Sequence, residues 1–401
     1  MLHGLRVLDL TFYLPGPYAT LFLADLGAEV IKIENPAGGD PLRRLGPEGG
    51  TPSGSVFFRA VNRNKKSVTL DLKTPEGRDL FLRLAATADA VIEQFRPGVA
   101  ARLGVDHRAV RERNPRLTYV SLSGYGQTGP LAGEAGHDIN YMAQSGLLSL
   151  FAESSEMEAG RLPLPPVQLA DLNGGNLAAI ALLTGMLSAR LTGRGSYIDV
   201  SMTDGLLSLM ALTVSNHLAG GGEPVRENLF LTGGEPQYNV YQTADGRFLS
   251  VGALEPKFWL NLCQVLARVD PEGRPAEAIA RSREETARVF ARKTAAEWMS
   301  LLEGLDVCVR PVLTVAEALK DPYVRERGMV VEVDGLRQVR LPFFPASWEP
   351  LARPAPRLGE HNRQTLSSLG VGEAQLQELA GRGVISCEPT SKRARGGTTD
   401  A

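Results

Sequence analysis

Cysteine and histidine are scarce in this chain of 401 residues. The three cysteines, Cys263, Cys308 and Cys387, are odd in number and far apart, and no CxxC or Cys/His ligand spacing occurs. Zinc sites and disulfide frameworks need such spacings, so the sequence predicts neither a metal nor a disulfide. Reduced thiols fit a cytoplasmic protein, which is the expected location.

An excess of charge and a long apolar run are also missing. Lys and Arg total 43 against 45 Asp and Glu, for a formal net charge of −2. Nucleic acids and anionic membranes bind basic surfaces, so neither is a predicted partner. No uninterrupted apolar run approaches membrane-spanning length, and the chain starts without a charged-then-apolar leader. A soluble chain of about two or three domains is expected.

The beginning of the chain is patterned as a strand, a helix and a second strand. Residues 6–12 and 29–34 are rich in β-branched and apolar side chains, and residues 18–26 form an amphipathic pattern. Such a unit within about thirty residues predicts a parallel sheet and an α/β fold. The first turn, residues 15–17, is Pro-Gly-Pro in place of G-x-G-x-x-G, which argues against an NAD or FAD enzyme.

Further strands and helices follow, and a second unit begins after a glycine-rich linker. The predicted elements are a helix at 74–86, strands at 90–94 and 117–124, a helix at 174–191, a linker at 220–235 and a β-hairpin at 238–252. The 174–191 helix is apolar nearly all round, which predicts that it is buried.

One histidine and one aspartate stand beside segments patterned as helices. His137 precedes one such segment, and Asp171 precedes the apolar helix. Helix N-termini carry unpaired N–H groups that stabilise an anion. Two bases and an anion-stabilising helix start suit proton abstraction next to a carbonyl group. Capping by Asp138 or Asn140 with a structural histidine is the simpler alternative, and it remains open at this point.

Cations cluster on both sides of the strand predicted near residue 70. The four are Arg63, Lys65, Lys66 and Lys73. Clustered Lys and Arg suit a polyphosphate ligand, whereas the alternative is a solvated run of charge. Arg96 follows the strand at 90–94, at the carboxyl end where ligands of parallel sheets gather, so it is a further phosphate candidate.

Taken together, these motifs resemble the class III CoA-transferase family over nearly the whole chain. The motifs shared across the family are LADLGA at 23–28, KSVTLDLK at 66–73, NPRL at 114–117 and TGRG at 192–195. Three more are similar to its α-methylacyl-CoA racemase branch: GHDINY at 136–141, GGEP at 233–236 and GALEP at 252–256. The histidine in GHDINY is the most specific, because transferase relatives usually lack it.

The resemblance implies a Rossmann-like parallel-sheet large domain, a smaller α+β domain and an interlocked homodimer. The implied divisions are 1–190 for the large CoA-binding domain, 191–232 for linker helices, 233–328 for the small domain, 329–386 for a segment returning to the large domain and 387–401 for a disordered tail.

The implied activity is inversion of the α-carbon of a 2-methylacyl-CoA thioester by proton transfer through an enolate. His137 and Asp171 would then be the two proton-transfer residues, and Glu255 would orient the histidine. The alternative is a CoA-transferase in which Asp171 is the nucleophile. A transferase needs neither the histidine nor Glu255, so both residues favour the racemase.

The resemblance implies that coenzyme A is the carrier part of the substrate and that no other cofactor is required. The residues expected to bind it are Arg43, Lys65, Lys66, Leu70, Asp71, Leu72, Lys73, Arg96, Asp138 and Tyr141. Asn35 stands where the racemases carry an arginine, which changes nucleotide binding more than chemistry.

Proton return requires a protonated Asp171, and burial must therefore raise its pKa from about 3.9.

Overall fold

The computed structural model describes residues 1–270, 272–343 and 353–386, and the chain divides into two compact units. The first unit contains Met1–Ser145, Val167–Leu209 and the chain from Gly328 onward, and the second contains Gly146–Pro166 and Met210–Arg327. Two divisions therefore differ from those expected: 146–166 joins the second unit, and the range 191–232 is divided after Leu209. The expected tail at 387–401 lies outside the described residues.

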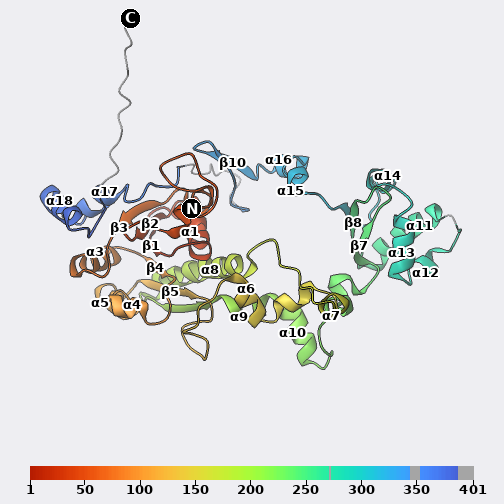
Figure 1. Cartoon of the computed structure of the whole chain (residues 1–401), viewed down its shortest axis with the longest axis horizontal. Coiled ribbons are helices and arrows are strands. Elements are labelled where there is room, and N and C mark those ends of the chain that lie inside the picture. Colours follow the sequence, from red (N-terminus) through yellow and green to blue (C-terminus); the bar gives the residue numbers. More distant parts are fainter. Residues whose placement is uncertain (271, 344–352, 387–401) are drawn as a thin grey trace, which may run out of the picture. The chain divides into compact units, whose positions relative to one another are not determined.

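A six-stranded parallel sheet forms the centre of the first unit (Figure 1). Its strands are β1 Arg6–Leu10, β2 Glu29–Glu34, β3 Lys66–Thr69, β4 Ala90–Glu93, β5 Thr118–Ser123 and β6 Tyr197–Ser201. They follow the order β3-β2-β1-β4-β5-β6, and all neighbours are parallel. The α/β prediction is confirmed. Strand order reverses between β1 and β4, the point where ligands bind such sheets.

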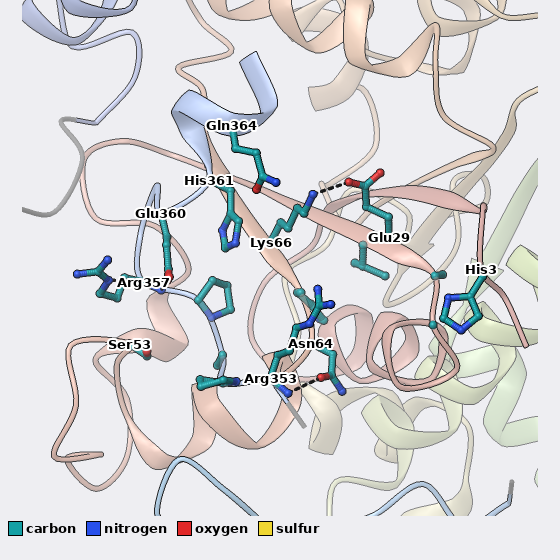
Figure 2. Close-up of a pocket in the computed structure, with 17 residues that line it drawn as sticks. His3, Glu29, Ser53, Asn64, Lys66, Arg353, Arg357, Glu360, His361 and Gln364 are labelled. Atoms are coloured by element: carbon teal, nitrogen blue, oxygen red, sulfur yellow. Dashed lines mark hydrogen bonds and ion pairs between the residues drawn. The ribbon is translucent and has the colours of Figure 1, made fainter. Parts of the chain in front are cut away.

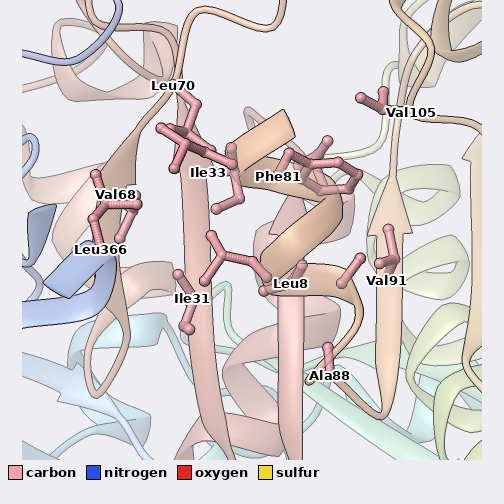
Figure 3. Close-up of a cluster of buried hydrophobic side chains, with 14 of the residues drawn as sticks. Leu8, Ile31, Ile33, Val68, Leu70, Phe81, Ala88, Val91, Val105 and Leu366 are labelled. Carbon is pink, nitrogen blue, oxygen red and sulfur yellow. The ribbon is translucent and has the colours of Figure 1, made fainter. Parts of the chain in front are cut away.

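Helices connect these strands and bury the sheet. They are α1 Pro15–Asp25, α2 Val56–Asn62, α3 Pro75–Ala85, α4 Val99–Leu103, α5 His107–Arg113, α6 Asp138–Gln144, α8 Leu169–Thr192, α9 Met202–Leu209, α17 Asn362–Ser367 and α18 Glu373–Gly381. Leu8, Ile31 and Val91 of the sheet pack with Phe81 of α3 and Leu366 of α17 (Figure 3). The C-terminal segment thus completes the core beside β3.

Helix α8 differs from its prediction in two ways. It begins at Leu169, ahead of the predicted start at residue 174, so Asp171 lies in its first turn. It is also only partly buried, and Ile180, Leu187 and Leu191 are exposed. By length and composition alone α8 could cross a membrane, a test that core helices of soluble proteins also pass; here it packs along α1 and β5.

The second unit is a small antiparallel sheet with helices. Its strands are β7 Tyr238–Gln242, β8 Phe248–Gly252 and β9 Val309–Pro311, and its α-helices are α7 Ser154–Glu158, α10 Ala211–Leu218, α11 Pro256–Val269, α12 Ala276–Ile279, α13 Arg283–Phe290, α14 Ala295–Leu301, α15 Val315–Ala318 and α16 Pro322–Glu326. The predicted hairpin is present as β7 and β8. Trp298 is fully buried in the core, and its indole N–H donates to the Phe290 carbonyl at 2.8 Å.

A glycine pair sets the packing of α8. A Cβ atom on Gly175 would lie 2.7 Å from the carbonyl oxygen of Pro15, and one on Gly174 would lie 2.6 Å from Cγ of Met202. Side chains at these positions would push α8 away from α1 and α9. The pair therefore permits close helix packing and does not interrupt the helix. For this reason α8 extends through both glycines and begins before the predicted start.

We expect Gly175→Ala to destabilise the protein by about 1–3 kcal/mol, because backbone must move to admit the methyl group. Gly381→Ala is the matched control: this helical glycine of α18 has nothing within 4 Å of its Cβ position. There alanine should be neutral or stabilising by up to about 1 kcal/mol. Thermal melts of both variants test this, and equal melting temperatures would contradict the packing role.

Candidate active site

A cavity of about 490 Å³, called here the His137 cavity, opens at the carboxyl ends of β4 and β5 in the first unit. Its volume is typical of small-molecule sites. His137 and Asp171 both line it, with Arg96 and Tyr141. The structure thus brings together the two residues that the sequence analysis selected as bases, although they are far apart in the chain.

His137 stands at the start of α6. Its backbone N–H donates to the Asn140 side chain at 3.0 Å, so Asn140 caps the helix as the alternative interpretation expected. The imidazole is exposed, and the Tyr13 ring meets it edge-on with centroids 6.5 Å apart. Tyr13 has a φ of 58°, a left-handed conformation that is rare outside glycine. Tyr13 was not among the predicted site residues; its one signal in the sequence was an aromatic side chain shortly after the end of β1.

The Asp138 carboxylate caps a helix other than its own. Its Oδ1 accepts the backbone N–H groups of Ala170 at 2.7 Å and Asp171 at 3.1 Å, at the start of α8. Burial and then the negative charge of Asp138 raise the pKa of Asp171 to about 7. At neutral pH, Asp171 therefore populates both its protonated and its ionised form, as two-base proton transfer requires.

Tyr141 fixes the chain just before His137. Its hydroxyl donates to the Gly136 carbonyl at 2.5 Å, and its ring meets Tyr125 edge-on at 5.1 Å. A Cβ atom on Gly124 would lie 2.2 Å from the Tyr141 ring, so glycine there makes room for the tyrosine. Burial and the nearby Asp171 raise the pKa of Tyr141 to about 12, which keeps its hydroxyl neutral.

A second cavity of about 320 Å³, the strand-end cavity, lies at the carboxyl ends of β1, β2 and β3. The predicted contact residues Leu70, Asp71, Leu72 and Lys73 all line it. Phe12 and Phe95 line both cavities, so the two are neighbours along one edge of the sheet. Arg96 follows Phe95 on the side of the His137 cavity.

Arg43 is placed differently from its prediction as a CoA ligand. Its guanidinium is buried and donates to the Glu34 carboxylate at 2.8 and 2.7 Å, and it lies 3.8 Å from the centre of the Phe58 ring. Its charge neutralises a buried carboxylate at the end of β2. This placement argues against direct contact between Arg43 and CoA.

Neither Lys65 nor Lys66 lines the strand-end cavity. The buried Lys65 ammonium lies 3.2 Å from the Asp9 carboxylate and donates to Asn62 at 2.9 Å. Lys66 is the first residue of β3, at the opposite edge, and pairs with Glu29 at 2.6 Å. The predicted cation cluster is therefore divided between a buried ion pair and the other end of the sheet, because tertiary packing supplies carboxylates that the local sequence does not show.

Glu255 belongs to the second unit, where it is the exposed residue that precedes α11. The role predicted for Glu255, which is to orient the imidazole of His137, stays a prediction.

Comparison with known proteins agrees with this architecture. A model of CoA-transferase family III matches residues 2–362. The alpha-methylacyl-CoA racemase of Mus musculus is 36% identical over 390 residues, which cover 94% of this chain and 96% of that protein. The succinate–glutarate CoA-transferase of Agrobacterium fabrum is 35% identical over 394 residues, covering 92% and 95%. A solved CAIB/BAIF family protein from Brucella suis matches with a TM-score of 0.79 at 30% identity, covering 92% of this chain and 99% of that chain.

The first unit thus has an α/β fold with the His137 cavity at the carboxyl edge of its parallel sheet. The chain belongs to CoA-transferase family III. Its relatives include both racemases and CoA-transferases at similar identity, so sequence identity alone does not distinguish the two activities.

The raised pKa of Asp171 predicts a pH-dependent stability. Between pH about 4 and 7 the folded protein keeps a proton on Asp171 that the unfolded chain loses, so the contribution of this group to stability falls as pH rises through that window. Asp171→Asn, a neutral isostere, should raise the thermal midpoint by a few degrees at pH 8 (on the order of 1–2 kcal/mol) and leave it unchanged at pH 4.

The matched control is Asp204→Asn, an exposed carboxylate on α9, which should change neither midpoint. Differential scanning calorimetry at the two pH values measures the effect. An equal shift at pH 4 and pH 8 would show that burial does not hold a proton on Asp171.

Proposed function

We propose that this protein is a racemase or epimerase of 2-methylacyl-CoA thioesters. The observation that carries the proposal is that His137 and Asp171 line one cavity while the pKa of Asp171 stands near 7. Inversion at a thioester α-carbon removes a proton on one face and returns a proton on the other. It therefore needs two groups whose resting protonation states differ.

In one direction the neutral imidazole of His137 takes the α-proton and the protonated Asp171 delivers its own to the opposite face. The roles reverse in the other direction. The enolate oxygen formed between these steps needs hydrogen-bond donors, and the backbone N–H groups at the start of α6, near Asp138, supply them. Each such donor is worth about 3–4 kcal/mol in comparable oxyanion sites.

The carrier part of the substrate is assigned to the neighbouring cavity. We place the nucleotide of CoA in the strand-end cavity, against Leu70 to Lys73, with Arg96 near the phosphates. The support is the position of this cavity at the carboxyl edge, beside the strand-order reversal, and the shared wall of Phe12 and Phe95. Arg43, Lys65 and Lys66 are left out because none of them lines the strand-end cavity.

A CoA-transferase is the second candidate, and it rests on the relatives with that activity. There the ionised Asp171 would attack the acyl group, forming a mixed anhydride and then an aspartyl-CoA thioester. The position of His137 in the same cavity favours the racemase, because a transferase has no step that uses an imidazole.

Proton exchange distinguishes the two activities. We expect the protein, given a 2-methylacyl-CoA in deuterated water and no second acid, to introduce deuterium at the α-carbon, as read by mass spectrometry. His137→Ala should lower the exchange rate by about 100-fold or more, the usual contribution of a general base.

His217→Ala is the control, since this histidine lies in the second unit and contacts the Gly222 carbonyl on its surface. It should exchange at the wild-type rate. Transfer of CoA to an added carboxylic acid without α-deuterium would overturn the racemase in favour of the transferase.

We also propose that the protein acts as a homodimer. Apolar side chains are exposed on helices of each unit: Ile180, Leu187 and Leu191 on α8, Leu207 and Leu209 on α9, and Leu212 and Leu218 on α10. Within each unit, exposed apolar side chains gathered on helices in this way are typical of protein interfaces. A second copy of the chain is the occupant that the interlocked arrangement implied by the family resemblance predicts.

Sedimentation equilibrium should therefore give twice the chain mass of 43.1 kDa at micromolar concentration. The proton-exchange assay, measured on the same fractions, shows whether the dimer is the active species. A 43.1-kDa species with full exchange activity would contradict the dimer.

A further inference from the structure

A third cavity, of about 620 Å³, lies in the first unit at the edge of the sheet opposite the proposed active site (Figure 2). We call it the amino-edge cavity. Glu29 and Lys66, the first residues of β2 and β3, form part of its wall, and the segment from Arg353 to Gln364 forms another part. Since CoA is assigned to the carboxyl edge, the proposed function leaves this cavity unexplained.

Positive charge predominates in the wall of the amino-edge cavity. Its cations are Lys65, Lys66, Arg353 and Arg357, beside the imidazoles of His3 and His361, and its carboxylates are Glu29 and Glu360. The Lys65 charge is already paired with Asp9. Glu29 is shared, because it pairs with Arg6 as well as Lys66, each at 2.6 Å. Across residues 1–270, 272–343 and 353–386, no carboxylate pairs with the Arg353 guanidinium. Arg357 has a longer contact of 3.8 Å with the Glu360 carboxylate. The Arg353 guanidinium is therefore the donor most available for an anion, with Arg357 and Lys66 beside it.

Three of these cations act on one imidazole. Burial lowers the pKa of His361, Glu360 opposes this effect, and the charges of Lys66, Arg353 and Arg357 lower the pKa further. The Nδ1 atom of His361 accepts the backbone N–H of Ser67 at 3.3 Å. The neutral ring therefore carries its proton on Nε2, where it is a hydrogen-bond donor. Figure 2 shows His361 and Lys66 on adjacent sides of the cavity.

The remaining wall combines small apolar residues with the polar side chains of Ser53, Asn64 and Gln364. Ala28 and Val30 contribute from β2 and the turn before it, and Pro354, Ala355 and Pro356 contribute from the C-terminal segment. A lone phosphate ion would leave most of this wall uncovered, because the volume is within the range of sites for whole organic ligands.

We propose that the amino-edge cavity binds a nucleotide-sized organic phosphate. Arg353 and Arg357 hold the phosphate, since guanidinium groups match phosphate oxygens in pairs, and Lys66 and the Nε2–H of His361 complete the donors. The planar organic part lies against Pro354 and Pro356. This site is independent of the proposed acyl-CoA site and is separated from it by the sheet.

Isothermal titration calorimetry of the full chain with AMP, adenosine and inorganic phosphate tests the site. AMP should bind, inorganic phosphate should bind more weakly, and adenosine should not bind measurably. The double variant Arg353→Gln, Arg357→Gln should weaken AMP by about tenfold or more, the usual effect of losing charge-assisted hydrogen bonds. Arg111→Gln, an exposed arginine of α5, is the matched control and should leave AMP affinity unchanged.

CoA distinguishes this site from the strand-end cavity. Saturating CoA should leave AMP bound, and Arg96→Gln should weaken CoA without affecting AMP. Bound AMP should also raise the pKa of the His361 imidazole in an NMR titration, because the phosphate offsets the surrounding cations.

Several results would overturn the proposal. They are no binding of AMP at millimolar concentration, full AMP affinity in the double variant, or competitive displacement of AMP by CoA. Equal affinity for AMP and inorganic phosphate would show that the site binds the phosphate alone and not the organic part of the ligand. If the double variant does not fold, Arg353→Gln alone supplies the same comparison, and the His361 titration in the wild-type protein needs no variant.

Discussion

The carboxylate of Asp138 joins the starts of two helices, and the arrangement of the site depends on it. Two of the unpaired N–H groups at the beginning of α8 donate to this side chain, which itself belongs to the first turn of α6. His137 precedes Asp138 directly, and Asp171 carries one of the donated N–H groups. The same bridge therefore sets where both proposed bases stand and adds a negative charge beside Asp171.

Much of this architecture was predictable from local patterns, because the βαβ unit and the carboxyl-edge residues are encoded by short stretches of sequence. The assignment of His137 and Asp171 to one site and the contact role of Leu70 to Lys73 came from the family resemblance. The structure places the first pair in one cavity and the second group in the neighbouring cavity. The start of α8 was missed because Gly174 and Gly175 look like breakers until α1 and α9 are packed against them. The role of Lys65 was missed because Asp9, its partner, is 56 residues away in the chain.

Buried charge shapes the carboxyl edge as much as apolar packing does. Burial alone would raise the pKa of Asp9, but Lys32 and Lys65, with hydrogen bonds from Thr11 and Thr20, hold it well below its usual range. Lys32 also pairs with Asp40 at 3.0 Å, and the second oxygen of Asp40 accepts the backbone N–H of Tyr13. The buried Lys32 thus supports the loop that carries Tyr13 to His137. Removing one partner of such a pair typically costs about 3–5 kcal/mol, since it leaves an unpaired buried charge.

The environment of Asp171 also bears on which chemistry this member of the family performs. A nucleophilic carboxylate must be ionised, and a pKa near 7 lowers the ionised fraction at neutral pH relative to an ordinary aspartate. Burial at this position therefore works against the first step of a transferase. Proton transfer in two directions uses both forms of the acid in turn, and its rate benefits when neither form is rare. An aspartate kept near half protonation, beside an imidazole in one cavity, suits racemisation better than acyl transfer.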